Sequence, residues 1–399
     1  MAKAAMRASL AGHGFENAGM ESASKTLPFI LSGPQETIVG QGTKSLLPLV
    51  PAKDLSQSIA AFWRAEPKAR MIAGILPFDY AKPAHLFVPE RIERMLPEPS
   101  STKHTASKPN NWKSIAEPAP EAYAQAVKRA LELLDSKSDL RKVVLARSLL
   151  MTASSPIDLN AVLAQLRRDP SITTYAVPLP PDANSTPHTL IGATPELLVD
   201  KRGAQVQSLP LAGSARRHPE NGADEAAAKA LMSSQKDQLE HGFVVEAILD
   251  TLAPYCAALS APHKPSLIST ASMWHLGTAI SGRLKDAAIS VLELAAALHP
   301  TPAVCGLPRA AARNSIAELE DFDRGFYAGA VGWANCAGDG RWMVAIRCAD
   351  FAGNTARLYA GAGIVTGSDP WSEVAETSAK FSALLAALGI DETGKSIQE

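Results

Sequence analysis

The sequence predicts an α+β protein built on antiparallel β-sheets. Apolar, strand-like runs follow one another with short turns, and helical segments are inserted between groups of strands. A doubly wound parallel sheet would instead alternate single strands with helices. The phosphate-binding motifs GxGxxG and GxxxxGK[ST] are absent from the sequence, so nucleotide dependence is not indicated.

Composition indicates a globular protein with a substantial core. The 399 residues are 46% hydrophobic and 20% charged, with a net charge of -1, which argues against general nucleic-acid binding. No run of about 20 apolar residues is present, so we expect no membrane span. The four cysteines have no metal-binding spacing and suit a reducing compartment. These features predict a cytoplasmic protein.

The order of patterns along the chain divides it into segments. Residues 1–25 are rich in Ala, Gly and Ser without a signal peptide's apolar core, and we expect a disordered leader there. One domain is expected over 26–395. It comprises an N-terminal lobe of strands (26–97), a polar loop (97–120) and a larger portion (121–390) that holds the candidate site residues.

Individual elements of the larger portion follow from periodicity, capping residues and turns. Helices are expected over 121–134, 159–168 (capped by Asp158), 220–232, 236–252 and 291–298. Strands are expected over 141–151, 174–179, 189–202, 204–217, 341–351 and 355–365. The last two should form a hairpin through "AGN", and a final helix should begin at Ser368 or Asp369 with Pro370 in its first turn.

That final helix carries an unusual charged stripe. Glu373, Glu376 and Lys380 fall within about 60° of arc, on the border of the apolar face. An exposed ion pair between residues four apart would explain Glu376 and Lys380 equally well. A polar site beside the core is the other interpretation.

Further charged residues stand in apolar settings. Glu240 lies on the apolar face of its helix, and Glu196 follows Pro195 within a strand-like run. Lys142 opens the strand "KVVLAR", and Arg347 lies in "MVAIRCADF". Burying an unpaired charge costs several kcal/mol, so each needs a partner. Internal salt bridges, or an outward-reaching lysine, would suffice.

A functional interpretation connects these residues. Carboxylates are ligands that Mg²⁺ accepts, and Mg²⁺ usually completes its shell with water and oxygens of an anionic substrate. An arginine in an apolar setting usually binds a carboxylate. The residues alone therefore indicate a Mg²⁺-assisted enzyme that acts on a small anionic molecule.

An ordered set of motifs resembles the chorismate-utilising enzymes, and among them most closely the isochorismate synthases. The motifs are "KVVLAR", "GATPELL", "PLAGSARR", "KDQLEH", "MWHLGTAISG", "HPTPAVCG", "YAGAVGW", "AIRCA", "YAGAGIV" and "SEVAET". They run from about residue 140 to 388 in fixed order. The resemblance implies a chorismate-binding fold like that of anthranilate synthase component I. It also implies that water adds at C2 of chorismate while the C4 hydroxyl leaves.

Roles for individual residues come from the same resemblance. Lys142 would be the general base that activates water, and Glu196 the general acid, which requires a raised pKa. Glu240, Glu373 and Glu376 would hold Mg²⁺. The remaining residues would bind the substrate: Ser214, His275, Thr278, Ala303, Tyr327, Arg347, Tyr359, Ala362, Gly363 and Lys380. Chorismate would be the partner, bound by a monomer that needs no glutaminase subunit.

Three positions bear on the choice among family members. Lys142 occupies a position at which amine-adding relatives carry an amide, which favours water as the nucleophile. Ala303 resembles the isochorismate synthases, whereas Tyr327 also resembles the salicylate synthases, which go on to eliminate pyruvate. Salicylate synthase and a non-catalytic chorismate-binding subunit therefore remain alternatives. Siderophore, menaquinone and salicylate pathways all remain open for the product.

Overall fold

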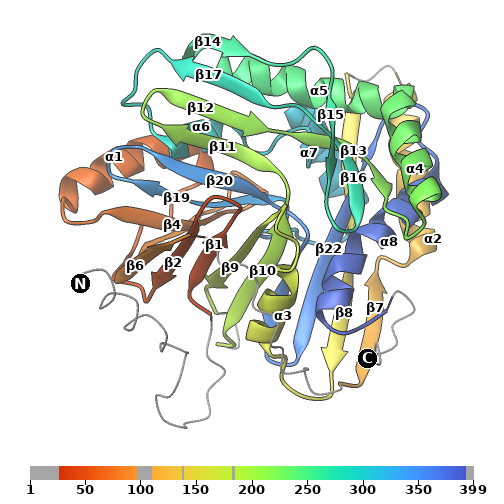
Figure 1. Cartoon of the computed structure of the whole chain (residues 1–399), viewed down its shortest axis with the longest axis horizontal. Coiled ribbons are helices and arrows are strands. Elements are labelled where there is room, and N and C mark those ends of the chain that lie inside the picture. Colours follow the sequence, from red (N-terminus) through yellow and green to blue (C-terminus); the bar gives the residue numbers. More distant parts are fainter. Residues whose placement is uncertain (1–26, 97–109, 137–138, 182–184, 392–399) are drawn as a thin grey trace, which may run out of the picture.

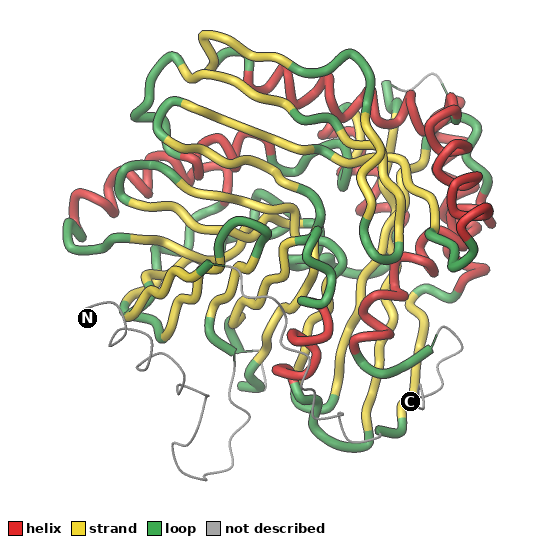
Figure 2. The backbone as a smooth tube through the Cα atoms, viewed as in Figure 1, coloured by secondary structure: helices red, strands yellow, loops and turns green. Residues whose placement is uncertain are grey.

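The computed structural model describes residues 27–96, 110–136, 139–181 and 185–391. Within these residues every pair of bonded strands is antiparallel, which confirms the predicted fold class (Figures 1 and 2). None of the helices described there has the length and apolar character needed to cross a membrane. The expected leader, residues 1–25, lies outside the described residues.

The largest sheet holds ten strands in the described part of the chain. Its order is β18-β8-β22-β21-β10-β9-β1-β2-β6, and β7 also pairs with β8. The strands are β1 (Phe29–Ser32), β2 (Thr37–Gln41), β6 (Arg91–Met95), β7 (Trp112–Glu117), β8 (Lys142–Ala153), β9 (Thr173–Leu179), β10 (His188–Thr194), β18 (Gly306–Leu307), β21 (Cys348–Ala352) and β22 (Thr355–Ile364).

A second large sheet has the order β14-β17-β12-β11-β20-β19-β4-β5-β3, and a small sheet has the order β13-β16-β15. The second sheet contains β3 (Ser45–Leu46), β4 (Met71–Leu76), β5 (His85–Val88), β11 (Leu197–Arg202), β12 (Gln205–Leu209), β14 (Cys256–Ser260), β17 (Ile280–Leu284), β19 (Gly329–Asn335) and β20 (Gly340–Ala345). The small sheet contains β13 (Leu211–Arg216), β15 (Ser266–Ser269) and β16 (Met273–Gly277). The N-terminal strands are therefore divided between the ends of both large sheets.

Helices cover the sheets and link them. Figure 1 shows α2, α4 and α8 gathered beside the long strands β8 and β22, while α5 runs across one end. The helices are α1 (Leu55–Ala65), α2 (Pro120–Asp135), α3 (Leu159–Leu166), α4 (Asn221–Ser233), α5 (Gln235–Leu252), α6 (Val291–Leu298), α7 (Arg309–Leu319) and α8 (Pro370–Ala387), with a short 3-10 turn at Ala52–Asp54.

All six predicted helices are confirmed, and so are two of their caps. The carboxylate of Asp158 accepts hydrogen bonds from the backbone N–H groups of Asn160 and Ala161 in α3, and Asp369 caps α8 with Pro370 as its first residue. Two helices, α1 and α7, were not predicted. In α1 the apolar residues Leu55, Ile59 and Phe62 recur at helical spacing, but the surrounding strand pattern hides them.

The expected polar loop over 97–120 is wrong at its end. Residues 112–117 form β7, which pairs with residues 148–153 of β8. Its side chains are largely exposed, as on an edge strand, so an apolar pattern gave no indication of it. Residues 97–109 lie outside the described part of the chain.

Three predicted strands are in fact pairs of strands in different sheets. The run 204–217 passes at Pro210 from β12 in the second sheet to β13 in the small sheet. The other two runs cross between the large sheets. The run 189–202 leaves the large sheet after Thr194 and enters the second sheet at Leu197, with Pro195 and Glu196 between them. The run 341–351 crosses in the same way between β20 and β21, at Ile346 and Arg347. Pro195 has no N–H for a ladder, which favours a break. Arg347 adopts φ +51, a left-handed conformation that ends a strand.

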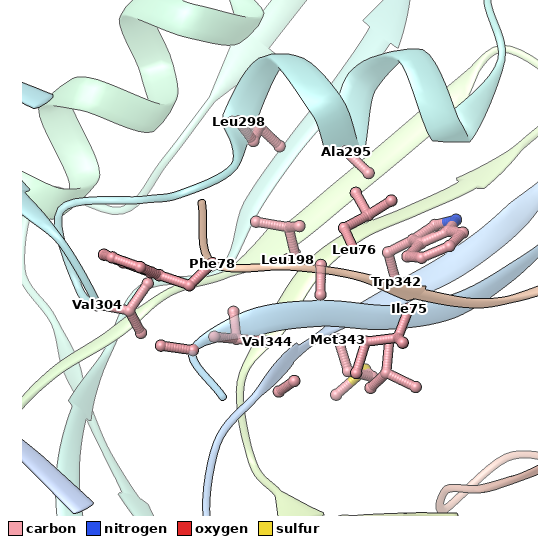
Figure 3. Packing of buried hydrophobic residues seen from close by; sticks show 14 of the residues in the cluster. Ile75, Leu76, Phe78, Leu198, Ala295, Leu298, Val304, Trp342, Met343 and Val344 are labelled. Atoms are coloured by element: carbon pink, nitrogen blue, oxygen red, sulfur yellow. The ribbon is translucent and has the colours of Figure 1, made fainter. Parts of the chain in front are cut away.

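The hydrophobic core lies against the second sheet and continues to the site. Figure 3 shows Ala295 and Leu298 of α6 near Leu76, Leu198 and Trp342 of three strands, all of them buried. Full burial of a leucine-sized side chain contributes roughly 1.5–3 kcal/mol. The same cluster includes Val304, which also lines the cavity described below, so the core supports the site directly.

Candidate active site

A polar cavity of about 70 Å³ lies where the three sheets meet. Both crossing points contribute to its wall, through Glu196 and Arg347, and so do α5 and α8. The predicted residues that line it are Glu196, Ser214, Glu240, His275, Ala303, Tyr327, Arg347, Tyr359, Gly363, Glu376 and Lys380. Eleven of the fifteen predicted site residues therefore lie in the wall of one cavity.

Four predicted site residues do not line the cavity. Lys142 and Glu373 lie directly behind lining residues, through the ion pairs described below. Thr278 hydrogen-bonds His241, at 2.7 Å between Oγ1 and Nε2, and is not among the residues that line the cavity. Ala362 is also absent from the lining.

The backbone of β22 explains why Ala362 is replaced by a neighbour. Lys380 Nζ donates to the carbonyl of Gly361 at 2.8 Å, so the C=O and N–H groups of Gly361 point away from β8. In antiparallel pairs these directions alternate, so Gly363 points the same way and Ala362 faces its partner Leu145 in β8. Gly361 and Gly363, both in the lining, are therefore the positions that can present backbone N–H groups to a ligand.

Lys142 is fully buried at the start of β8. Its Nζ lies 2.9 Å from Oε1 of Glu240, which projects from α5 with 9% of its side chain exposed. The position of Gly363 keeps this pair in place, because a Cβ there would lie 2.0 Å from Glu240 Oε1 and 3.0 Å from Lys142 Cε. The pair thus depends on glycine in the adjacent strand.

Replacing Gly363 with alanine is expected to lower turnover by about 10² or more, because the new methyl group must displace the Glu240 carboxylate, and small misplacements at a reacting centre cost this much. Steady-state kinetics on the purified variant would measure the loss. Gly242→Ala is the control, since nothing lies within 4 Å of its added Cβ. Turnover within threefold of the unmodified protein for Gly363→Ala would contradict this role for the glycine.

Glu196 is a buried carboxyl group at the first crossing point. Burial raises its pKa to about 8, although the nearby Lys142 ammonium and the Leu211 N–H act in the opposite direction. At neutral pH the group is therefore mostly protonated. A protonated carboxyl in a cavity can donate a proton, which is the property that a general acid needs.

Glu373 and Glu376 of α8 differ in their partners. Glu376 pairs with Lys380 at 2.6 Å and accepts from Ser214 Oγ at 2.9 Å. Burial alone would raise its pKa, but these groups and Lys236 hold that pKa below its ordinary value. Glu373 pairs with Lys236 at 2.6 Å, and burial followed by repulsion from Glu376 raises its pKa.

Arg347 presents a cation at the second crossing point. Burial lowers its pKa to about 10, which leaves it charged at neutral pH. Its guanidinium makes no hydrogen bond to any side chain or backbone group in the described ranges, although Glu376 and Glu196 act on it electrostatically. A half-buried arginine in a cavity wall, without a fixed partner among the described residues, suits a bound carboxylate.

Aromatic and imidazole groups complete the wall. Tyr327 and Tyr359 stack with ring centroids 4.9 Å apart and planes 9° from parallel. The pKa of His275 is held well below its ordinary value by burial and by the cations Arg347 and Lys380, so this imidazole is neutral. Its Nε2 is buried and has no partner among the residues that the structure describes.

Several residues of the site were missed from the sequence. Lys236 stands four residues before Glu240 on the same helix face, so the helical period could have revealed it. Glu320 and Arg324 form an ion pair of 2.5 Å that also bonds the Ala146 N–H and the Val144 carbonyl of β8. These last bonds depend on tertiary packing, and the sequence offers no signal for them.

The carboxylates can be tested as ligands of Mg²⁺. In the described ranges no three His, Cys, Asp or Glu side chains are already arranged as a metal site. The buried Oε2 of Glu373, however, has no hydrogen-bond partner there, and Glu376 repels that carboxylate. A divalent cation would bind the unpartnered oxygen and offset the repulsion between the two carboxylates, and Mg²⁺ prefers carboxylate oxygens as ligands. The residues therefore fit Mg²⁺.

Comparison with known proteins places this site in a family. Residues 79–389 match the family described as chorismate binding enzyme. The chain belongs to the chorismate-binding enzyme family. This confirms the resemblance inferred from the ten sequence motifs.

Individual relatives of the family cover almost the whole chain. Isochorismate synthase DhbC of Bacillus subtilis (strain 168) is 40% identical over 376 residues, which are 91% of this chain and 94% of the relative. Isochorismate synthase EntC of Escherichia coli (strain K12) is 38% identical over 85% of this chain and 88% of its own.

Solved structures agree with the fold. The putative 2,3-dihydroxybenzoate-specific isochorismate synthase DhbC from Bacillus anthracis has a TM-score of 0.86 and 42% identity, over 91% of this chain and 96% of its own. Anthranilate synthase component I from Streptococcus pneumoniae TIGR4 has a TM-score of 0.68 at 20% identity, over 95% of each chain. The latter shares the fold, as the resemblance implied.

Proposed function

We propose that this chain is an isochorismate synthase, in which water adds at C2 of chorismate and the C4 hydroxyl leaves. Family membership and relatives of that activity at 38–40% identity support the assignment. The observation that carries it is a fully buried lysine, Lys142, beside a cavity whose wall holds a carboxyl group that is protonated near neutral pH, Glu196. A base for water and an acid for the departing hydroxyl are what this exchange needs.

The proposed roles follow from the geometry. Lys142, acting as the neutral amine, takes a proton from the attacking water, and Glu196 gives a proton to the departing C4 hydroxyl. Arg347 binds one substrate carboxylate through its guanidinium, which has no hydrogen-bond partner among the described residues, and the backbone N–H groups of Gly361 and Gly363 assist. Water is the nucleophile, so no ammonia-supplying partner is required.

Mg²⁺ is the proposed cofactor, held by Glu240, Glu373 and Glu376. When bound, it would neutralise the ring carboxylate of the substrate and favour charge redistribution in the ring. The chain's own residues bind and orient the substrate around it. The buried Oε2 of Glu373, which has no hydrogen-bond partner among the described residues, supports this assignment.

The protein is proposed to act as a cytoplasmic monomer on chorismate. The free state of all four cysteines is consistent with a reducing compartment. The alternatives named from the sequence, salicylate synthase and a silent binding subunit, differ in their products.

Incubating the purified protein with chorismate and Mg²⁺ should yield isochorismate as the product, separated and identified by chromatography. We expect no salicylate or pyruvate, and no aminated product when ammonium is added. Stoichiometric salicylate and pyruvate would overturn the assignment in favour of salicylate synthase. Absence of any turnover would favour a non-catalytic subunit.

A further inference from the structure

Three lysines neutralise the three carboxylates of the site, and one of these lysines is unlike the other two. Lys142 is fully buried and cannot leave Glu240 for solvent. Lys380 holds Glu376 but is also fixed to the Gly361 carbonyl at 2.8 Å. Lys236 has 29% of its side chain exposed, and Glu373 is the partner of its ammonium in the described residues.

The position of Lys236 is electrostatically unfavourable on its own helix. It is the second residue of α5, where the helix dipole disfavours a cation by roughly 0.3–1 kcal/mol. Glu373 lies in the first turn of α8, where a carboxylate is favoured. The lysine is therefore held there by a tertiary contact, which joins the first turns of two helices far apart in the sequence.

The contact between Lys236 and Glu373 places an ammonium beside a carboxylate that is buried. The Glu373 side chain is 1% exposed, its Oε1 receives the Lys236 ammonium at 2.6 Å, and its Oε2 has no partner among described residues. Glu376 and Glu240 also act on Lys236 and, with Glu373, more than offset the effect of burial on its pKa. One ammonium thus lies within electrostatic reach of all three carboxylates.

We propose that Lys236 is a resident counter-cation that occupies Glu373 until a divalent cation displaces it. This inference rests on the proposed Mg²⁺ site. Each of the three carboxylates already pairs with a lysine, and Arg347 also acts on Glu376, so a divalent cation that enters adds two charges beside existing cations. Release of Lys236 into solvent, through its exposed end, relieves that repulsion. Lys236 stabilises the site when no metal is bound and lowers the affinity of the site for a divalent cation.

The test measures cation binding directly, without turnover. Lys236→Gln, Lys236→Arg and the unmodified protein would be titrated with Mn²⁺, followed by its electron paramagnetic resonance signal, in the absence of chorismate. We expect Lys236→Gln to bind on the order of tenfold more tightly, because a competing partly buried ion pair is gone. Lys236→Arg keeps the charge and should bind like the unmodified protein.

Thermal unfolding gives a second readout. Metal-free Lys236→Gln should unfold at a lower temperature than the unmodified protein, and excess Mg²⁺ should raise its Tm by more. Lys229→Gln is the control, because Lys229 is an exposed lysine of α4 and its removal should change neither affinity nor Tm.

The results distinguish failure of the counter-cation role from failure of the proposed metal site. Equal or weaker Mn²⁺ binding by Lys236→Gln, while the unmodified protein binds Mn²⁺, would overturn the counter-cation role alone. If Glu373→Gln leaves Mn²⁺ binding unchanged, the proposed metal site itself is wrong, and this inference fails with it.

Discussion

Replacing Lys142 with methionine is expected to lower the rate of isochorismate formation by about 10² or more, the usual contribution of a general base. Methionine keeps most of the volume of the buried chain but has no amine to accept a proton from water. Steady-state kinetics with chorismate would measure the effect. The loss should appear in kcat, because the Lys142 nitrogen contacts Glu240 and does not line the cavity.

Loss of a buried charge could also weaken the fold, and the chain offers a control for this. Lys201 is likewise fully buried and pairs with Asp339 at 2.9 Å, outside the cavity. Lys201→Met should lower Tm and leave kcat within threefold of the unmodified protein. A Lys142→Met variant that folds and retains more than a tenth of the original kcat would show that another group activates water.

Glu196→Gln is expected to lower turnover by a similar factor and to change its dependence on pH. The pKa of Glu196 is raised to about 8 by burial, and the protonated form is the one that can act as an acid. In the unmodified protein kcat/KM should therefore fall above about pH 8, by about tenfold per pH unit. The variant cannot ionise at this position, so its residual activity should lack that alkaline fall.

Glu196→Gln should lower activity but should not lower stability at high pH. Its pKa in the folded protein lies above the ordinary value of 4.5, so its contribution to stability is complete below pH 4.5 and is lost as pH rises through about 8. Glu196→Gln should thus be at least as stable as the unmodified protein at pH 9, as thermal unfolding would show. Glu246→Gln, on an exposed position of α5, controls for a general charge effect. An unchanged alkaline limb in Glu196→Gln would exclude this residue as its source.

Local patterns were sufficient for most helices. Asp158 and Asp369 are capping residues whose effect is confined to one helical turn, and both cap as expected. The apolar setting of Glu240 also indicated burial correctly, because a helix face is set by the 3.6-residue period alone. The failure at α1 arose where helical and strand periods overlap in short apolar runs.

Local patterns could not reveal the points at which the chain passes from one sheet to another. The run around Glu196 and that around Arg347 each read as one strand, because both halves are apolar whichever sheet they join. Only the register of neighbouring strands reveals that β10 and β11, or β20 and β21, lie in different sheets. The consequence for function is direct, since each crossing places a charged group in the cavity wall.

The sequence by itself therefore determined the fold class, two helix caps and the burial of Glu240, since these follow from local patterns of residues along the chain. The tertiary structure decided which charges meet. Lys236 reaches Glu373 across 137 positions, and Thr278 bonds His241 and is absent from the cavity wall. Such pairings depend on how helices and sheets pack in space, and the contact energy between distant side chains leaves no periodic trace in the sequence.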